Sequence, residues 1–110
     1  MSGNKADLLR GTLDMLILKT LGLEPLHGLG ISRRIQQTTD GVFQVPPGSL
    51  FPALGRLEQE GWVRGAWGES ENRRRARYYE LTAAGRRRLG DQERHWGRIV
   101  GAISKVLESA

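Results

Sequence analysis

Residues 62–81 show the two-residue alternation of β-strands, whereas the patterns before and after them have the period of helices. Residues 62–67 predict one strand, the polar run 68–72 predicts a turn, and residues 74–81 predict a returning strand. The resulting hairpin has a long, charged tip. We therefore expect a mainly α fold that carries a two-stranded β element.

Two helices are predicted at the start of the chain. Apolar residues at helical spacing predict the first over residues 6–23, and Pro25 is its stop signal. These apolar residues lie on more than one side of the helix, so we expect one side to face a second subunit. After a turn, an amphipathic second helix is predicted over residues 28–37, with Ile31 and Ile35 directed inward.

A third helix is predicted to begin at residues 46–48, which follow a short β-prone stretch at residues 42–45. Pro52 falls in its first turn, where no intrahelical N–H bond is lost, and Gly61 is a natural C-cap. Three leucines at helical spacing predict its buried face: Leu50, Leu54 and Leu57.

A last helix is predicted from the N-cap Thr82 to residue 107, and its apolar stripe needs a partner. We divide the chain into residues 1–81 and a dimerisation helix at residues 82–110, which form one compact unit. We expect the stripe to pack against the first helix of a second subunit in a homodimer. The predicted interface residues are Leu9, Leu89, Trp96, Ile99, Ile103 and Val106.

The charge of the chain favours a polyanionic partner. Its 110 residues include 17 Lys and Arg against 12 Asp and Glu, which give a formal net charge of +5. Arg accounts for 14 of the basic residues, and its planar guanidinium matches phosphate and guanine edges better than the ammonium of Lys. Nucleic acid and an anionic membrane surface both fit this charge.

Several kinds of site are disfavoured by what the sequence lacks. Without Cys, a disulfide framework and a thiolate metal site are excluded, and we expect neither a metal nor a cofactor. The first residues lack the apolar stretch of a signal peptide, and the longest apolar run, residues 15–18, is far shorter than the roughly 20 residues of a membrane span. We expect a cytoplasmic protein without a membrane partner.

The predicted order of three helices, a hairpin and a final helix is that of a winged helix-turn-helix with a C-terminal dimerisation helix. Six motifs follow this order: LLRGTLD, LHG, GSLFPAL, RLE, RYY and LTAAG. In their order and spacing the chain resembles the short form of the PadR family of bacterial transcriptional regulators, over about residues 7–100.

The resemblance implies a sequence-specific, DNA-binding homodimer that regulates transcription. Such a dimer reads a pseudo-palindromic operator with half-sites about one helical turn apart or a multiple of it. We expect a repressor, because occupying a promoter needs no further surface. Small aromatic or drug-like effectors release DNA from some family members at or near the dimer interface; here Trp96 and Met15 are the predicted pocket residues, with ordinary dimer core as the alternative.

Three positions depart from the family pattern. Leu29 and Phe51 stand where members often have Tyr, which removes two phenolic hydroxyls from potential phosphate contact. Gly55 stands in the third helix where members commonly carry a longer residue. Gly at such a position costs about 1 kcal/mol of helix stability relative to Ala.

In the third predicted helix, Ser49 and Arg56 are the predicted DNA contacts. Arg donates two bonds to guanine, and Ser bonds either base edges or phosphate. The alternatives are that Ser49 only occupies the first helical turn and that Arg56 pairs with Glu60. Phe51 is either a DNA contact or a packing residue.

The three arginines of the hairpin tip are predicted to enter a narrow minor groove or to clamp phosphates. The alternative is a solvated turn that Glu69 and Glu71 partly neutralise. Arg33 and the start of the second helix at His27 are predicted to hold phosphate, with a structural turn role for His27 as the preferred alternative. The tip arginines are Arg73, Arg74 and Arg75.

Other classes of protein fit the sequence less well. An enzyme is disfavoured because His27 and His95 lie in unrelated elements and the sequence has no nucleophile motif, phosphate loop or metal-spaced cluster. RNA binding is disfavoured because the hairpin aromatics are interpreted as packing residues. The main alternative is a winged-helix module that binds protein without specific DNA binding, since it needs the same fold.

Overall fold

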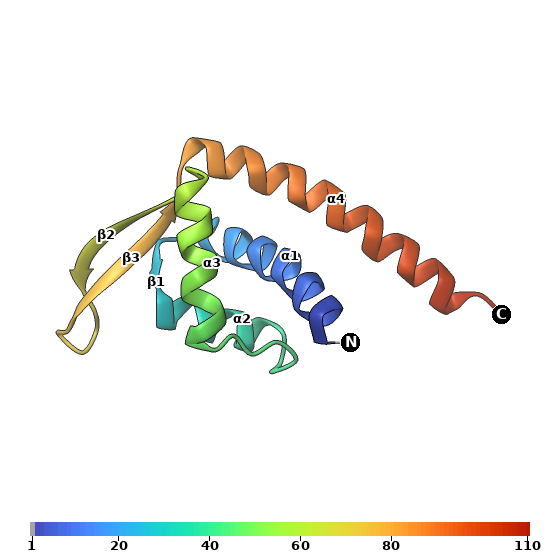
Figure 1. The fold of residues 1–110 in the computed structure, drawn as a ribbon, viewed down its shortest axis with the longest axis horizontal. Coiled ribbons are helices and arrows are strands. Elements are labelled where there is room, and N and C mark those ends of the chain that lie inside the picture. Colours follow the sequence, from blue (N-terminus) through green and yellow to red (C-terminus); the bar gives the residue numbers. More distant parts are fainter. Residues whose placement is uncertain (1) are drawn as a thin grey trace.

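The computed structural model describes residues 2–110, with side chains described from residue 11 onward. Over this part of the chain, helices precede and follow a small antiparallel sheet (Figure 1). The elements are α1 (Ser2–Leu21), β1 (Leu26–His27), α2 (Gly28–Thr38), α3 (Pro47–Gln59), β2 (Val63–Glu69), β3 (Arg75–Leu81) and α4 (Ala83–Glu108). The predicted mainly helical fold with a β wing is confirmed.

Side chains cap the first turns of α2 and α4. The backbone N–H of Gly30 donates to Nδ1 of His27, and that of Gly85 donates to Oγ1 of Thr82, each at 3.0 Å. Both bonds satisfy an N–H group that the start of a helix leaves without an intrahelical partner. The predicted N-cap at Thr82 is therefore confirmed, and His27 supplies a second one.

The sheet has three strands in the order β1-β3-β2, all antiparallel. β2 and β3 form the predicted hairpin, with Val63 opposite Leu81 and Glu69 opposite Arg75. The expectation of only two strands is incomplete, because the short strand β1 adds itself to the other edge of β3. A strand of two residues has no alternation of its own, so the sequence pattern did not reveal it.

The expected β-prone stretch at residues 42–45 is wrong, because the chain forms a loop there. The hydroxyl of Ser32 donates to the carbonyl oxygen of Val45 at 2.9 Å, and the backbone N–H of Phe43 donates to Oγ1 of Thr39 at 3.1 Å. Side chains of α2 and of its C-cap residue Thr39 therefore satisfy backbone groups that a strand would pair with a neighbouring strand.

The core lies between α1, α2, α3 and the inner face of the hairpin. The start of α4 closes one end of it, where a Cβ at Gly85 would collide with the carbonyl oxygen of Trp62. Only glycine permits this close approach of α4 to the start of β2. The most buried large side chains are Ile17, Leu18, Leu21, Ile31, Leu50, Leu54 and Leu57.

The C-terminal half of α4 projects beyond the other helices, and the described chain measures 55 × 28 × 25 Å (Figure 1). Its apolar side chains are exposed, with Val106 at 72% and Leu107 at 79% of their full accessibility. Among the described residues, no helix combines the length and the apolar character that crossing a membrane requires.

Candidate nucleic-acid interface

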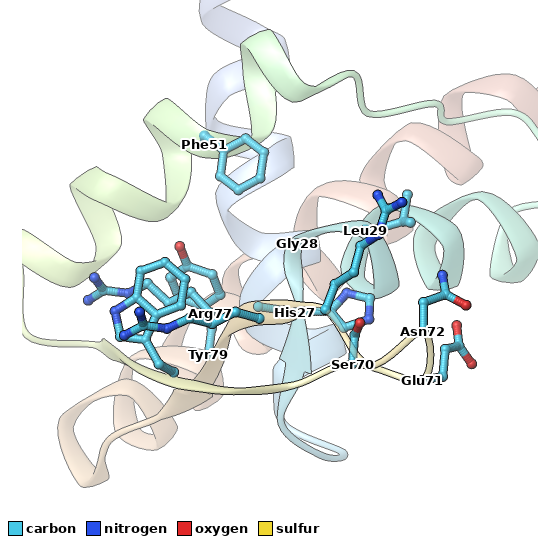
Figure 2. A pocket seen from close by; sticks show the side chains of 13 residues that line it. His27, Gly28, Leu29, Phe51, Ser70, Glu71, Asn72, Arg77 and Tyr79 are labelled. Carbon is cyan, nitrogen blue, oxygen red and sulfur yellow. The ribbon is translucent and has the colours of Figure 1, made fainter.

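A groove of about 470 Å³ lies between the start of α2, the exposed side of α3 and the hairpin of β2 and β3 (Figure 2). Residues distant in the sequence meet in it, because β1 brings the start of α2 next to β3. Its lining combines aromatic, apolar and basic side chains with the polar side chains of Ser70 and Asn72 and the carboxylate of Glu71. The aromatic, apolar and basic residues include Leu29, Phe51, Trp67, Arg74, Arg75 and Arg77.

The predicted contact residues of α3 have different surroundings. Ser49 is exposed in the first turn of the helix. Phe51 is 50% exposed and points from α3 into the groove (Figure 2). Its ring lies so close to α2 that a Cβ at Gly28 would be 2.8 Å from Cζ of Phe51. Phe51 therefore both packs against α2 and presents apolar surface to solvent.

Arg56 has a partner that the sequence analysis did not identify. Its Nη2 donates to Oδ1 of Asp14 in α1 at 2.9 Å, and no ion pair with Glu60 is found among the described residues. The two partners are 42 residues apart, so the helical spacing rule pointed to Glu60 instead. This ion pair ties α3 to α1, and the guanidinium keeps further N–H donors for another partner.

The hairpin tip presents its arginines to solvent. Arg73 and Arg74 are exposed, and Arg75 places its guanidinium 4.6 Å from the ring centroid of Trp67. The turn is closed by the N–H of Arg73, which donates to the oxygen of Ser70 at 2.9 Å. Arg73 has φ of 58°, a left-handed backbone conformation that favours glycine. The tip therefore has an arginine at a position where the backbone conformation alone favours glycine.

A second ion pair, between Arg77 and Glu58, joins the hairpin to α3. Nη2 of Arg77 donates to Oε2 of Glu58 at 2.6 Å. Gly65 on the neighbouring strand leaves room for the guanidinium, since a Cβ there would collide with it. Sequence reasoning did not find this pair. The sequence does contain two opposite charges that are each close to a buried residue, which is compatible with an ion pair. Only the fold shows that these two residues are neighbours.

The same pair affects Tyr79, which is buried beside it. Burial raises the pKa of the Tyr79 phenol above 10.0, and the carboxylate of Glu58 raises it further, whereas Arg77 acts in the opposite direction. Burial and a nearby negative charge both disfavour the phenolate. Tyr79 therefore stays neutral and packs in the core.

His27 and Arg33 lie at α2, as predicted. The imidazole of His27 accepts the capping bond from Gly30 through Nδ1 and packs edge-on against Tyr78, with 5.3 Å between ring centroids. This supports the structural role that the sequence analysis preferred. Arg33 is exposed and lies 3.5 Å from a carboxylate oxygen of Glu71 in the hairpin tip.

The predicted dimer residues divide into two groups. Leu89 is buried in its own protomer, and Trp96 is half-buried with its indole N–H donating to Gln92 at 3.1 Å. Ile103 and Val106 are exposed, and Ile99 is half-buried. The side chain of Leu9 lies outside the described part of the chain.

The predicted effector pocket has no counterpart among the cavities described for this part of the chain. Trp96 and Met15 line none of the four. Both residues are half-buried on helices that contact one another, α4 and α1. A pocket at these residues stays a prediction about the dimer.

Comparison with known proteins gives consistent matches. The model of the "Transcriptional regulator PadR-like family" matches residues 17–91. A transcriptional regulator from Clostridium thermocellum is 29% identical with a TM-score of 0.79, over 90% of this chain and 96% of that one. A PadR-like transcriptional regulator from Bacillus cereus strain ATCC 14579 has a TM-score of 0.81 at 24% identity, over 94% and 99% of the two chains. An uncharacterized 37.1 kDa protein in transposon TN4556 of Streptomyces fradiae is 38% identical over 96 residues, which make up 87% of this chain and 25% of that protein.

Proposed function

Because this chain belongs to the PadR-like family of transcriptional regulators, we propose that it binds double-stranded DNA as a homodimer and represses transcription. Each protomer reads one half of a pseudo-palindromic operator with α3 in the major groove, while the hairpin contacts the minor groove or the phosphates. The proposed contacts are Ser49, Phe51 and Arg56 of α3, His27 and Arg33 of α2, and Arg73, Arg74 and Arg75 of the hairpin tip.

The observation that carries this proposal is the placement of Arg74 and Arg75 across one groove from Phe51 on the exposed side of α3. None of the three tip arginines forms an ion pair among the described residues, and Arg75 stacks on Trp67. A chain with a net charge of +5 that presents exposed cations beside a helix is suited to a polyanion. The left-handed backbone at Arg73 adds support, since strained residues that persist are often functional.

The homodimer is supported by the exposed apolar side chains on α4. Val100, Ile103, Val106 and Leu107 fall on the same side of the helix as Trp96, by their spacing of three, four and seven residues. A single protomer leaves this apolar stripe in water. We place the second subunit there, so that the two α3 helices are related by a twofold axis.

We further propose that a small aromatic effector acts at the interface near Trp96 and Met15. It releases DNA only if it binds more tightly to a dimer whose α3 spacing does not match the operator. A thermal-shift screen of aromatic compounds with wild type and with Trp96→Ala tests this part of the proposal: binding that is independent of Trp96 contradicts it.

The proposed function is tested by selection from a pool of random-sequence duplexes at two salt concentrations. Enrichment of an inverted repeat is the expected result, and its two halves should lie about one or two helical turns apart. Salt-sensitive binding without enrichment contradicts sequence reading. An absence of binding at both salt concentrations contradicts DNA binding itself and favours the protein-interaction module.

A further inference from the structure

Two apolar side chains face the groove between α2, α3 and the hairpin, whose charged lining residues are three arginines and one glutamate, Glu71. Leu29 at the start of α2 is 55% exposed, and Phe51 on α3 is 50% exposed. Both line the same groove as Arg77 of the hairpin (Figure 2). Arg74 and Arg75 of the hairpin also line it. Neither side chain carries a donor or an acceptor for a phosphate or a base edge.

The two side chains are related through Gly28. The ring of Phe51 rests against Gly28, where any Cβ would have to displace it, and Gly28 is the direct neighbour of Leu29. The ring therefore lies at the first turn of α2, and 50% of the Phe51 side chain is exposed. We call Leu29 and Phe51 the apolar contact.

Leu29 and Phe51 are 22 residues apart in sequence and meet in one groove. Both side chains are purely apolar. A ligand group that suits this chain is thus apolar.

We propose that the apolar contact binds the C5-methyl group of a thymine in the major groove, so that each operator half-site carries a thymine at this position. This inference rests on the proposed DNA binding by α3. Among the base edges of the major groove, the thymine methyl is the apolar group, and contact with it distinguishes thymine from the other three bases. The arginines around the apolar contact bind the adjacent phosphates and bring the methyl group within reach.

The test uses the inverted-repeat duplex enriched from the random pool. Each thymine of a half-site is replaced in turn by deoxyuridine, which keeps the hydrogen-bonding edge and removes only the methyl group. We expect one position at which the dissociation constant rises by about fourfold, the effect of one buried methyl group. A second pair of duplexes carries 5-methylcytosine or cytosine at this position, each opposite guanine. The difference between their dissociation constants measures the effect of the methyl group on affinity a second time.

Protein variants locate the effect. The deoxyuridine penalty is the dissociation constant of the deoxyuridine duplex divided by that of the thymine duplex. In Leu29→Ala, which changes an exposed side chain of α2, we expect the affinity for the thymine duplex to fall and this ratio to approach one. Phe51→Ala should do the same, and Leu29→Ala keeps the test valid if loss of the ring disturbs folding. The matched control is Leu23→Ala, since Leu23 is 69% exposed and lies outside the groove; its deoxyuridine penalty stays at the wild-type value.

The outcomes separate this inference from the proposed function. If the enriched duplex binds tightly and no deoxyuridine changes the affinity, the methyl contact is wrong and DNA reading stands. A deoxyuridine penalty that persists in both Leu29→Ala and Phe51→Ala assigns the methyl contact to other residues and also overturns the inference. If no duplex is enriched or bound, both proposals are wrong.

Discussion

The hairpin and α3 at one end of the molecule differ from the C-terminal half of α4 at the other. The first region is charged and tied together by ion pairs, with Arg77 on Glu58 and Arg56 on Asp14. The second region exposes apolar side chains, such as Ile103 and Val106, that are not part of the core formed by the described residues. Each region is therefore incomplete in a different way.

The difference indicates what each region needs from a partner. Exposed cations are stable in water, so the first region needs no cover to stay folded, and an anion is the partner that its charge favours. Exposure of an apolar stripe to water is unfavourable, so the second region gains stability when another apolar surface covers it. Charge changes in the first region should alter DNA affinity, and charge changes in the second should alter the oligomeric state.

The largest expected effect comes from Ile103→Glu. A carboxylate in the proposed α4 interface would be buried without a partner, so the dimer dissociation constant should rise by about a hundredfold or more. Sedimentation equilibrium measures it. Trp96→Glu should act in the same direction. Lys105→Glu, two residues away and thus on the opposite side of α4, is the control. A dimer that survives Ile103→Glu places the interface elsewhere.

Replacing Arg73, Arg74 and Arg75 together by Gln should weaken binding to every duplex, by about tenfold or more at moderate salt. The slope of log affinity against log salt should fall by about two to three, because each phosphate contact contributes about 0.9. Titrations at several salt concentrations measure both. The control removes the same charge from α4 by changing its exposed arginines Arg86, Arg87 and Arg98 to Gln. Equal losses in both variants would show that only net charge matters.

Glu58→Gln should lower the free energy of unfolding by about 1 kcal/mol, because it leaves the half-buried guanidinium of Arg77 without its charged partner. Urea unfolding measures the change. Glu80→Gln removes a more exposed ion pair, with Arg64 on the same hairpin, and should cost less than about 0.5 kcal/mol. If the two variants lose the same stability, the Glu58–Arg77 pair does not hold the hairpin to α3.

The smallest expected effect compares two glycines on exposed helix surfaces. A Cβ at Gly55 in α3 or at Gly97 in α4 would meet nothing within 4 Å. Gly55→Ala and Gly97→Ala should each raise the free energy of unfolding by about 0.5–1 kcal/mol, because Gly is disfavoured inside a helix. Only Gly55→Ala should also lower affinity for the enriched duplex, since α3 is proposed to lie against DNA and α4 is not. Equal affinity in both variants would argue against that placement.

Elements with their own periodicity were predictable from the sequence. The leucines of α3 and the isoleucines of α2 are buried as their spacing predicted, and Thr82 caps α4. Such signals are local, because one face of a helix or one turn determines them. β1 and the loop at residues 42–45 were not predictable, since their structure depends on which neighbour reaches their backbone.

The candidate site was less predictable than the fold. The exposure of the tip arginines was predictable, because they lie in or next to a turn between two strands. The exposure of Ser49 was predictable, because it lies in the first turn of a helix. In contrast, the partners of Arg56 and Arg77 lie 42 and 19 residues away, and no spacing rule connects such distances. The pairing of Leu29 with Phe51 in one groove also depends on tertiary packing, and in particular on the missing side chain at Gly28.

The most direct test of sequence reading by this chain is the ratio of two dissociation constants at physiological salt. One is for the enriched inverted-repeat duplex, and the other is for a duplex of the same composition in shuffled order. Specific regulators bind their sites at least about a thousandfold more tightly than other DNA, and we expect a ratio of that size. A ratio near one would leave only the basic surface and would contradict the account.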